Sequence, residues 1–336
     1  KKLMKAFRHL LSLSLVALLT LLLTAGTNVT TVFVIGDSTA AEKSHPDTNP
    51  ERGWGMVLQG FFDKNVRVEN HAVNGRSSKS FIDEGRWQKV LDRIKPGDYV
   101  LIQFGHNDEK SNPKRHTDPG TTFDANLTRY VNETRAKGGI PVLLSCVVRR
   151  NFLRTVNDSI EDESLRNTKY EDEKINSDTL IDTHGAYKDV PRYLAKRLNV
   201  PFVDANRLTH DLEQGMGIEG SRKLHMWFRP GEIKSIPKGR HDNTHYNVYG
   251  AHLVAGLIAD ALAKEVPQLG KHVVHYDYIV SRQGRGNFMS LQQAVDAIPA
   301  GKKVKVYVLD GTWERPTWNK KEKKIKFVFY PGATLK

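Results

Sequence analysis

Residues 31–39 read TVFVIGDST and join an apolar run to a polar turn that carries a serine. The run from Thr31 to Ile35 is rich in β-branched and aromatic residues, as is typical of a strand buried on both faces. Gly36 ends this run, so Ser38 is expected just beyond the carboxyl end of the strand. Ligands bind beyond those ends in open parallel sheets. Other polar groups that follow strands are therefore expected near Ser38.

Short apolar runs alternate with longer amphipathic stretches after this first strand. The apolar runs predict strands at residues 31–35, 66–69, 98–104, 140–147 and 200–203. Helical spacing of apolar residues predicts helices at 54–62, 81–94, 122–137, 187–198 and 249–265. This alternation predicts an α/β fold, a three-layer α/β/α sandwich with a doubly wound parallel sheet. The polar stretch 149–182 is expected to be a solvated excursion or a flexible loop.

The composition excludes several classes of protein. The 336 residues suffice for a sizeable core, and the single cysteine, Cys146, excludes an internal disulfide framework and a cysteine-based zinc site. The net charge of +13 is concentrated at the two ends, because residues 271–336 hold 13 Lys or Arg against 5 Asp or Glu. The body from 26 to 270 is close to neutral, which argues against a nucleic-acid-binding face.

The first 25 residues have the pattern of an export signal. Basic residues precede an apolar run from Leu10 to Leu23, which ends in Thr24-Ala25-Gly26. This pattern predicts a cleaved signal peptide at 1–25, a secreted or periplasmic location, and no membrane span after its removal. The alternative is a membrane-anchoring helix, which needs about 20 apolar residues.

Four polar segments follow the predicted strands or precede the last helix. They are Gly36-Asp37-Ser38-Thr39, Asn74-Gly75-Arg76-Ser77-Ser78, Gly105-His106-Asn107-Asp108 and Asp242-Asn243-Thr244-His245. Each has a plain structural interpretation: an ordinary turn or a helix N-cap for Ser38, a turn for Gly75, an Asx-turn for Asn107 and a surface loop for the last. A functional interpretation is that a serine, hydrogen-bond donors and a histidine converge at one sheet edge.

The last segment places an aspartate three residues before a histidine. The Asp242 carboxylate can accept a hydrogen bond from His245 Nδ1, which leaves Nε2 to take a proton from a serine. A metal site is the alternative, since His241 and His245 lie four residues apart with Asp242 between them. No further ligand set is evident in the sequence, so we expect no metal and no cofactor.

In this order and at these strand ends, the four segments resemble the SGNH (GDSL-like) hydrolases over residues 30–268. The resemblance implies Ser38 as nucleophile, His245 as general base and Asp242 as the carboxylate that orients it. It also implies an oxyanion hole formed by the Ser38 N–H, Gly75 and Asn107. The Gly-x-Ser-x-Gly elbow of α/β-hydrolases is absent from the sequence.

Further motifs resemble the rhamnogalacturonan acetylesterase branch of that family. They are Gly53-Trp54-Gly55, the segments from Gly75 to Phe81, from Phe104 to Asp108 and from Val148 to Phe152, Thr183-His184-Gly185-Ala186-Tyr187, and the run from Asp242 into Tyr249-Gly250-Ala251. One departure is the Asn-Thr spacer between Asp242 and His245, and the long loop 206–241 suggests a different substrate groove. The branch implies an acetylated pectic polysaccharide as substrate, with Trp54, Arg76 and His106 as expected contacts. Arg76 has two interpretations, a partner for a galacturonate carboxylate through its planar guanidinium or a solvated surface arginine.

The chain changes character near residue 270. A strand is predicted at 278–280, a helix at 291–298 and further strands at 304–309 and 325–330. The segments 280–288, 291–299 and 307–314 resemble the opening of a pectin methylesterase, which implies the start of a right-handed parallel β-helix. The predicted organisation is therefore a signal peptide at 1–25, an esterase domain at 26–270 and a truncated second domain at 271–336. A generic αβ fragment is the alternative for the tail, and no catalytic residue is assigned to it.

These features predict an exported serine esterase that removes O-acetyl groups from pectin, in particular rhamnogalacturonan, through an acetyl-serine intermediate. A second interpretation is an SGNH esterase acting on acetylated xylan or on a lipid ester. A third is a non-catalytic pectin-binding module, and a fourth is adhesion to polyanions through the basic tail.

Overall fold

A five-stranded parallel sheet forms the centre of the protein. The computed structural model describes residues 29–160, 162–165 and 173–336, and the predicted signal peptide at 1–25 lies outside these ranges. The strand order is β2-β1-β3-β4-β5, and every neighbouring pair is parallel. The strands are β1 (Thr30–Gly36), β2 (Val66–Asn70), β3 (Tyr99–Gln103), β4 (Ile140–Leu144) and β5 (Phe202–Val203). The predicted α/β fold with a parallel sheet is confirmed.

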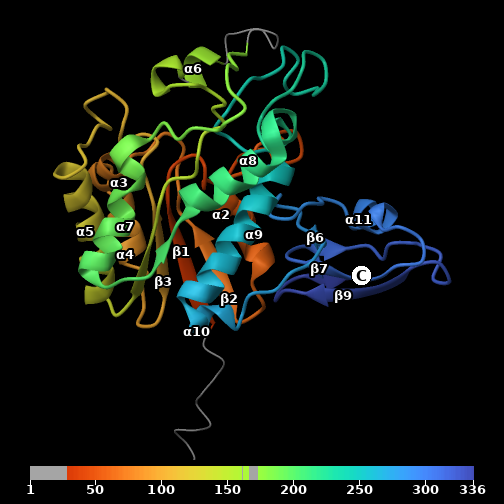
Figure 1. Ribbon diagram of the computed structural model, residues 1–336. Helices are drawn as coiled ribbons and strands as arrows, with labels where there is room; N and C mark the ends of the chain where they lie inside the picture. Colours follow the sequence, from red (N-terminus) through yellow and green to blue (C-terminus); the bar gives the residue numbers. More distant parts are fainter. Residues whose placement is uncertain (1–28, 161, 166–172) are drawn as a thin grey trace, which may run out of the picture.

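Helices cover both faces of this sheet, because side chains of each strand alternate between two apolar clusters. Phe33 and Ile35 of β1 face one cluster, and Val32 and Val34 face the other. The first face is covered by α3 (Ser78–Asp83), α4 (Arg86–Leu91), α5 (Thr122–Ala136) and α7 (Val190–Leu198) (Figure 1). The second is covered by α2 (Trp54–Val57), the 3₁₀ turn η1 (Leu58–Phe61), α8 (Ala205–Arg222), α9 (Val248–Glu265) and α10 (Pro267–Gly270).

Two predicted helices are each divided in the structure. The helix predicted at 81–94 is α3 followed by α4, because Gly85 interrupts the helical backbone with φ of 68°. The helix predicted at 54–62 becomes a 3₁₀ turn after Val57. Both changes leave the predicted apolar side chains facing the core.

The segments between β4 and α9 differ more from the prediction. The loop predicted at 206–241 begins with α8, which contains a kink at Gly217 (φ 67°). The excursion at 149–182 has little regular structure in its described part: η2 (Val156–Asp158), α6 (Asp162–Leu165) and a bridge between Phe152 and Leu180. The short turn η4 (Gly185–Lys188) then leads into α7.

The strand order creates a switch point between β1 and β3. From β1 the chain goes outward to β2, and it then crosses back to β3 on the other side of β1. Connections after β1 and β3 therefore leave on opposite faces, which opens a crevice beyond their carboxyl ends. Ser38 and Asn107 lie in the loops that begin there.

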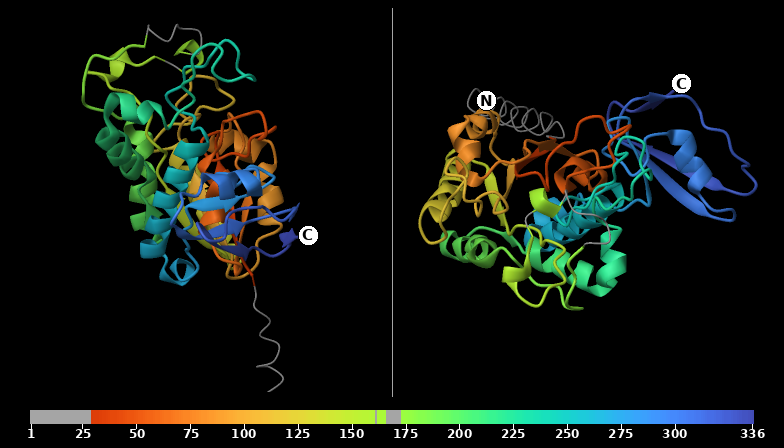
Figure 2. Two further views of the ribbon diagram at one scale, coloured as in Figure 1. Left: turned by 90° about the vertical axis from the view of Figure 1, so that its right-hand side faces the viewer. Right: turned by 90° about the horizontal axis from the view of Figure 1, so that it is seen from above.

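The C-terminal segment forms a smaller unit with its own core. Its elements are β6 (Tyr278–Val280), α11 (Leu291–Ala297), β7 (Lys303–Val308), β8 (Thr312–Trp313), β9 (Lys324–Phe329) and β10 (Thr334–Leu335). Strands β6, β7 and β9 form one parallel sheet, and β8 pairs with β10, also in parallel. Figure 2 shows this unit beside the main sheet. The predicted β-helix stays a prediction.

Specific contacts attach this unit to the second face of the main domain. The Tyr307 hydroxyl donates to the Phe62 carbonyl at 2.8 Å, and the Tyr330 hydroxyl donates to the Val66 carbonyl at 3.0 Å. The exposed ends of β7 and β9 carry lysines in register, with Lys303 opposite Lys324 and Lys305 opposite Lys326. Directly opposed like charges destabilise a ladder.

Within the described ranges, no helix combines the length and the apolar character that crossing a membrane requires.

Candidate active site

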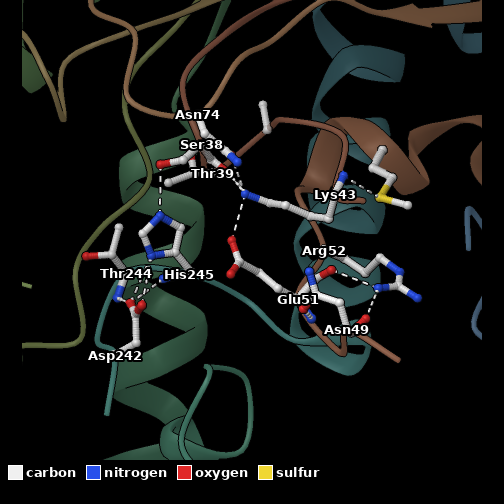
Figure 3. A network of polar contacts seen from close by, with 12 residues as sticks. Ser38, Thr39, Lys43, Asn49, Glu51, Arg52, Asn74, Asp242, Thr244 and His245 are labelled. Carbon is white, nitrogen blue, oxygen red and sulfur yellow. Dashed lines mark hydrogen bonds and ion pairs between the residues drawn. The ribbon is translucent and has the colours of Figure 1, made fainter. Parts of the chain in front are cut away.

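Ser38, His245 and Asp242 lie in one hydrogen-bonded row at the switch point of the sheet. Ser38 Oγ is 2.8 Å from His245 Nε2, and His245 Nδ1 is 2.9 Å from Asp242 Oδ2 (Figure 3). A carboxylate only accepts, so Nδ1 carries the ring proton and Nε2 is the acceptor for the serine hydroxyl. The predicted pair and the predicted serine, far apart in sequence, are brought together in this order.

The aspartate is fixed by several donors. Asp242 is completely buried and accepts from the backbone N–H groups of Thr244 at 3.0 Å and His245 at 2.9 Å. Arg240 Nη2 donates to its other oxygen at 2.7 Å. These donors hold the carboxylate in one position, and the carboxylate in turn holds the imidazole in one orientation. The Asn-Thr spacer thus supplies part of the geometry that orients His245.

Ser38 does not cap a helix. It lies in a turn that the neighbouring Asp37 side chain holds together. Asp37, fully buried, accepts from the Thr39 backbone N–H at 2.9 Å and from the Thr39 hydroxyl at 2.7 Å. Burial, the largest influence, raises the pKa of Asp37 against these hydrogen bonds. The turn leaves the Ser38 hydroxyl directed at His245.

A second row of charged groups lies behind the serine, and no motif in the sequence indicates it. Lys43 Nζ donates to the Ser38 carbonyl and to Asn74 Oδ1, both at 2.7 Å, and it contacts Glu51 at 2.7 Å (Figure 3). Glu51 in turn contacts Arg240 at 2.6 Å, and Arg240 contacts Asp242. The loop after β1 is therefore tied to the loop that carries the histidine. We call Lys43, Glu51 and Arg240 the charged bridge.

The charged bridge is largely buried, and its groups stabilise one another's charge. Burial would raise the pKa of Glu51, but Lys43, His245 and Arg240 together outweigh it and hold the pKa at about 2. Burial lowers the pKa of Lys43, and Glu51 offsets part of that effect. Breaking such a buried pair is strongly destabilising, since it leaves an uncompensated charge.

Gly75 and Asn107, the expected oxyanion donors, line the same cavity as Ser38 and His245. This cavity has a volume of about 370 Å³. Gly75 has φ of 74°, a conformation in which a side chain would be strained. Asn107 Nδ2 donates one hydrogen to the Arg76 carbonyl at 3.2 Å, which fixes the amide and leaves its second hydrogen for a ligand. The Asn107 side chain is thus hydrogen-bonded to the loop after β2, which carries Arg76.

The three expected substrate contacts lie in different places relative to the Ser38 cavity. Trp54 is a correction: it is fully buried and donates to Gln103 Oε1 at 3.1 Å, so it belongs to the core beneath the site. Arg76 lies beside the Ser38 cavity and not in it: its Nε is 3.0 Å from Glu84 and it lines a neighbouring hollow of about 360 Å³, so its contact with substrate stays a prediction. His106 does line the Ser38 cavity.

His106 is a buried histidine with unsatisfied nitrogens. Its side chain packs edge-on against His184 at 4.4 Å between ring centres, and neither ring nitrogen has a partner among the described residues. Burial first, and then the nearby His184 and Arg149, lower its pKa well below the ordinary value. His106 is therefore a neutral imidazole at the cavity wall.

The metal interpretation of the Asp242 loop finds no support in the geometry. The His241 ring stacks on Trp227 with centroids 4.6 Å apart, while His245 faces Ser38. In the ranges that the structure describes, no three His, Cys, Asp or Glu side chains are grouped as metal ligands.

Comparison with known proteins places the chain in a family. The model of the GDSL-like lipase/acylhydrolase family matches residues 34–253. The chain belongs to this family. Among curated relatives, it is 39% identical over 254 residues to the rhamnogalacturonan acetylesterase RhgT of Bacillus subtilis (strain 168), covering 76% of this chain and 96% of the relative. It is 28% identical to the rhamnogalacturonan acetylesterase of Emericella nidulans, covering 75% of this chain and 90% of the relative.

A solved structure shows the same fold. The crystal structure of the Bacillus subtilis protein YxiM is 25% identical, with a TM-score of 0.52 over 70% of this chain and 56% of that one. The family match ends before the C-terminal segment begins.

Proposed function

We propose that this GDSL-like protein is an exported carbohydrate acetylesterase that removes O-acetyl groups from pectic polysaccharide, in particular rhamnogalacturonan. The contact of 2.8 Å between Ser38 Oγ and His245 Nε2 carries the proposal, because it pairs a nucleophile with a base inside a polar cavity. The substrate class is supported by the two rhamnogalacturonan acetylesterases to which the chain is similar over nearly their whole length.

The reaction proceeds in two halves. Ser38 Oγ attacks the acetyl carbonyl carbon while its proton passes to His245 Nε2. The tetrahedral intermediate collapses, the bond from carbon to sugar oxygen breaks, and His245 returns the proton to the departing hydroxyl. Water then attacks acetyl-Ser38 with His245 again as base, and acetate leaves with the serine hydroxyl restored.

The negative charge that forms on the acetyl oxygen needs fixed donors. The backbone N–H groups of Ser38 and Gly75 and the free hydrogen of the Asn107 amide serve this role. Asp242 stabilises the imidazolium of His245 and keeps its ring aligned. No step needs a metal or an organic cofactor.

The cavity lining favours a small acyl group on a polar carrier over a lipid chain. Every residue that lines it is polar, charged or glycine, and four are cations: Lys110, Arg115, Arg149 and Arg240. An acyl chain needs an apolar channel. A basic, polar cavity is suited instead to sugar hydroxyls and to the carboxylates of an acidic polymer.

Acetate release tests this proposal. We expect the full chain to release acetate from acetylated rhamnogalacturonan, and we expect Ser38→Ala to abolish that release. Acetylated xylan is the comparison substrate, since deacetylation of xylan alone would refute the pectic assignment and keep the esterase. Binding to pectin without acetate release, in a folded protein, would instead favour a non-catalytic module.

A further inference from the structure

Arg115 lies beside Gly75 and Asn107, the two expected oxyanion donors that line the Ser38 cavity. A Cβ built on Gly75 would be 3.9 Å from the Arg115 guanidinium carbon, and Arg115 Nη1 is 3.5 Å from Asn107 Oδ1. The side chain is half-buried and borders both the Ser38 cavity and the adjacent hollow. It therefore stands between the reacting position and the space where a neighbouring sugar would lie.

The other arginines of this region have carboxylate partners within the protein. Arg240 contacts Glu51 and Asp242. Arg149 contacts Glu109, and Arg76 contacts Glu84. Arg115 forms no ion pair with any residue of the described ranges, and its one side-chain hydrogen bond is the contact with Asn107. A guanidinium is always charged and offers five donors, so most of its donors face the cavity and solvent.

A purely structural role explains Arg115 poorly. At 3.5 Å the contact with Asn107 is at the outer limit of a hydrogen bond, and it is weak. The amide is already fixed on its other side by the Arg76 carbonyl at 3.2 Å.

We propose that Arg115 binds a carboxylate of the substrate, carried by the acetylated sugar or by the sugar next to it, and so selects uronate-containing polymers. The planar guanidinium matches a carboxylate through two parallel hydrogen bonds. This inference rests on the proposed function, because the acetyl oxygen must lie at Gly75 and Asn107 for Arg115 to face the adjoining part of the sugar. Arg115 replaces Arg76 as the expected carboxylate partner.

Two substrates that differ only in charge test the assignment. One is acetylated rhamnogalacturonan, and the other is the same polymer with its uronate carboxylates reduced to primary alcohols. We expect Arg115→Gln to lower kcat/KM on the acidic polymer roughly 10- to 100-fold, as loss of a charge-assisted hydrogen bond does. On the reduced polymer and on a neutral aryl acetate, the change should stay within about twofold, and Arg115→Lys should restore part of the loss on the acidic polymer.

Arg76→Gln is the matched control. This arginine lies nearby but is paired with Glu84, so its loss should affect the acidic and the reduced polymer alike. An equal loss on both polymers in Arg115→Gln would mean that the residue acts only through Asn107 or the fold. No loss on the acidic polymer would equally overturn the assignment.

Inhibition separates this inference from the proposed function. Unacetylated oligogalacturonate should inhibit aryl acetate hydrolysis by the native protein. The same degree of inhibition of Arg115→Gln should need an oligogalacturonate concentration about tenfold higher or more. If native protein deacetylates only xylan but shows this difference, the proposed function fails and the carboxylate site stands. If oligogalacturonate inhibits both proteins equally, or neither, the carboxylate site is refuted.

Discussion

Replacing Glu51 by glutamine should lower the free energy of unfolding of the protein by a large amount that depends on pH. Glu51 joins Lys43 to Arg240 through contacts of 2.7 and 2.6 Å, and its side chain is only 11% exposed. Glutamine keeps the shape and loses the charge, so Lys43 remains buried without its carboxylate. The hydrogen bonds of Lys43 to the Ser38 carbonyl and to Asn74 persist.

The magnitude follows from the pKa of Glu51. Its ordinary value is 4.5, and the charged bridge and His245 hold it at about 2 in the folded protein. This interval corresponds to about 3 kcal/mol of stability. Because the folded pKa is depressed, the contribution is fully present above about 4.5. It is lost as the pH falls towards about 2, and roughly half is left near pH 3.

Urea unfolding of the native protein and of Glu51→Gln, from neutral pH down to about pH 3, measures this contribution. The difference in unfolding free energy should be about 3 kcal/mol at neutral pH and should shrink as the solution becomes acidic. Asp211→Asn is the control, since Asp211 is 59% exposed and pairs with Arg207 at 2.9 Å on the helix surface. Exposed pairs of this kind contribute about 0–1 kcal/mol. A difference for Glu51→Gln below about 1 kcal/mol, or one that does not change with pH, would refute the reasoning.

Three further variants test the site and the tail. Asn107→Ala should lower kcat roughly 10²- to 10³-fold with little change in KM, because it removes one donor to the oxyanion; steady-state kinetics with an unchanged kcat would contradict that role. Asp242→Asn should lower kcat by about 10⁴-fold, since an amide does not hold the imidazole in the required tautomer; a loss below about tenfold in a folded variant would exclude the orienting role. Lys326→Glu should raise the free energy of unfolding by about 0.2–1 kcal/mol, because it places an acid opposite Lys305, and added salt should reduce the gain; a destabilised variant would contradict the like-charge argument.

The strands and the Asp242–His245 pair could be predicted from local sequence, whereas joining that pair to Ser38 rested on the family resemblance. A buried parallel strand has a continuous apolar run, and Ser38 and Asn107 each follow such a run directly. Asp242 and His245 are three residues apart, so their contact depends on one short loop. The helix α9 starts just after them and fixes the position of that loop.

The rest of the site depends on contacts between loops that are distant in sequence. Lys43, Glu51 and Arg240 have no recognisable spacing, and only the folded chain shows that they form one bridge. Arg115 lies in a polar turn after Asn107. Two features of the folded chain distinguish it from Arg76: it lines the Ser38 cavity, and it has no acidic partner among the described residues.

Two further features could not be predicted from the hydrophobic spacing or the motifs. Helix α8 was missed because three glycines interrupt its apolar spacing and Gly217 kinks it. The motif that contains Trp54 resembles the rhamnogalacturonan acetylesterase branch and so suggested a substrate contact, but its indole N–H donates to Gln103 in the core.

The central claim is that Ser38 is the nucleophile of an acetylesterase. Mass spectrometry of peptides from protein quenched in acid during turnover of an acetyl ester tests it most directly. The account predicts one acetyl group on the peptide that contains Ser38, and none when Ser38→Ala is treated in the same way. Full activity of the Ser38→Ala variant, or turnover with the acetyl group on a different residue, would contradict it.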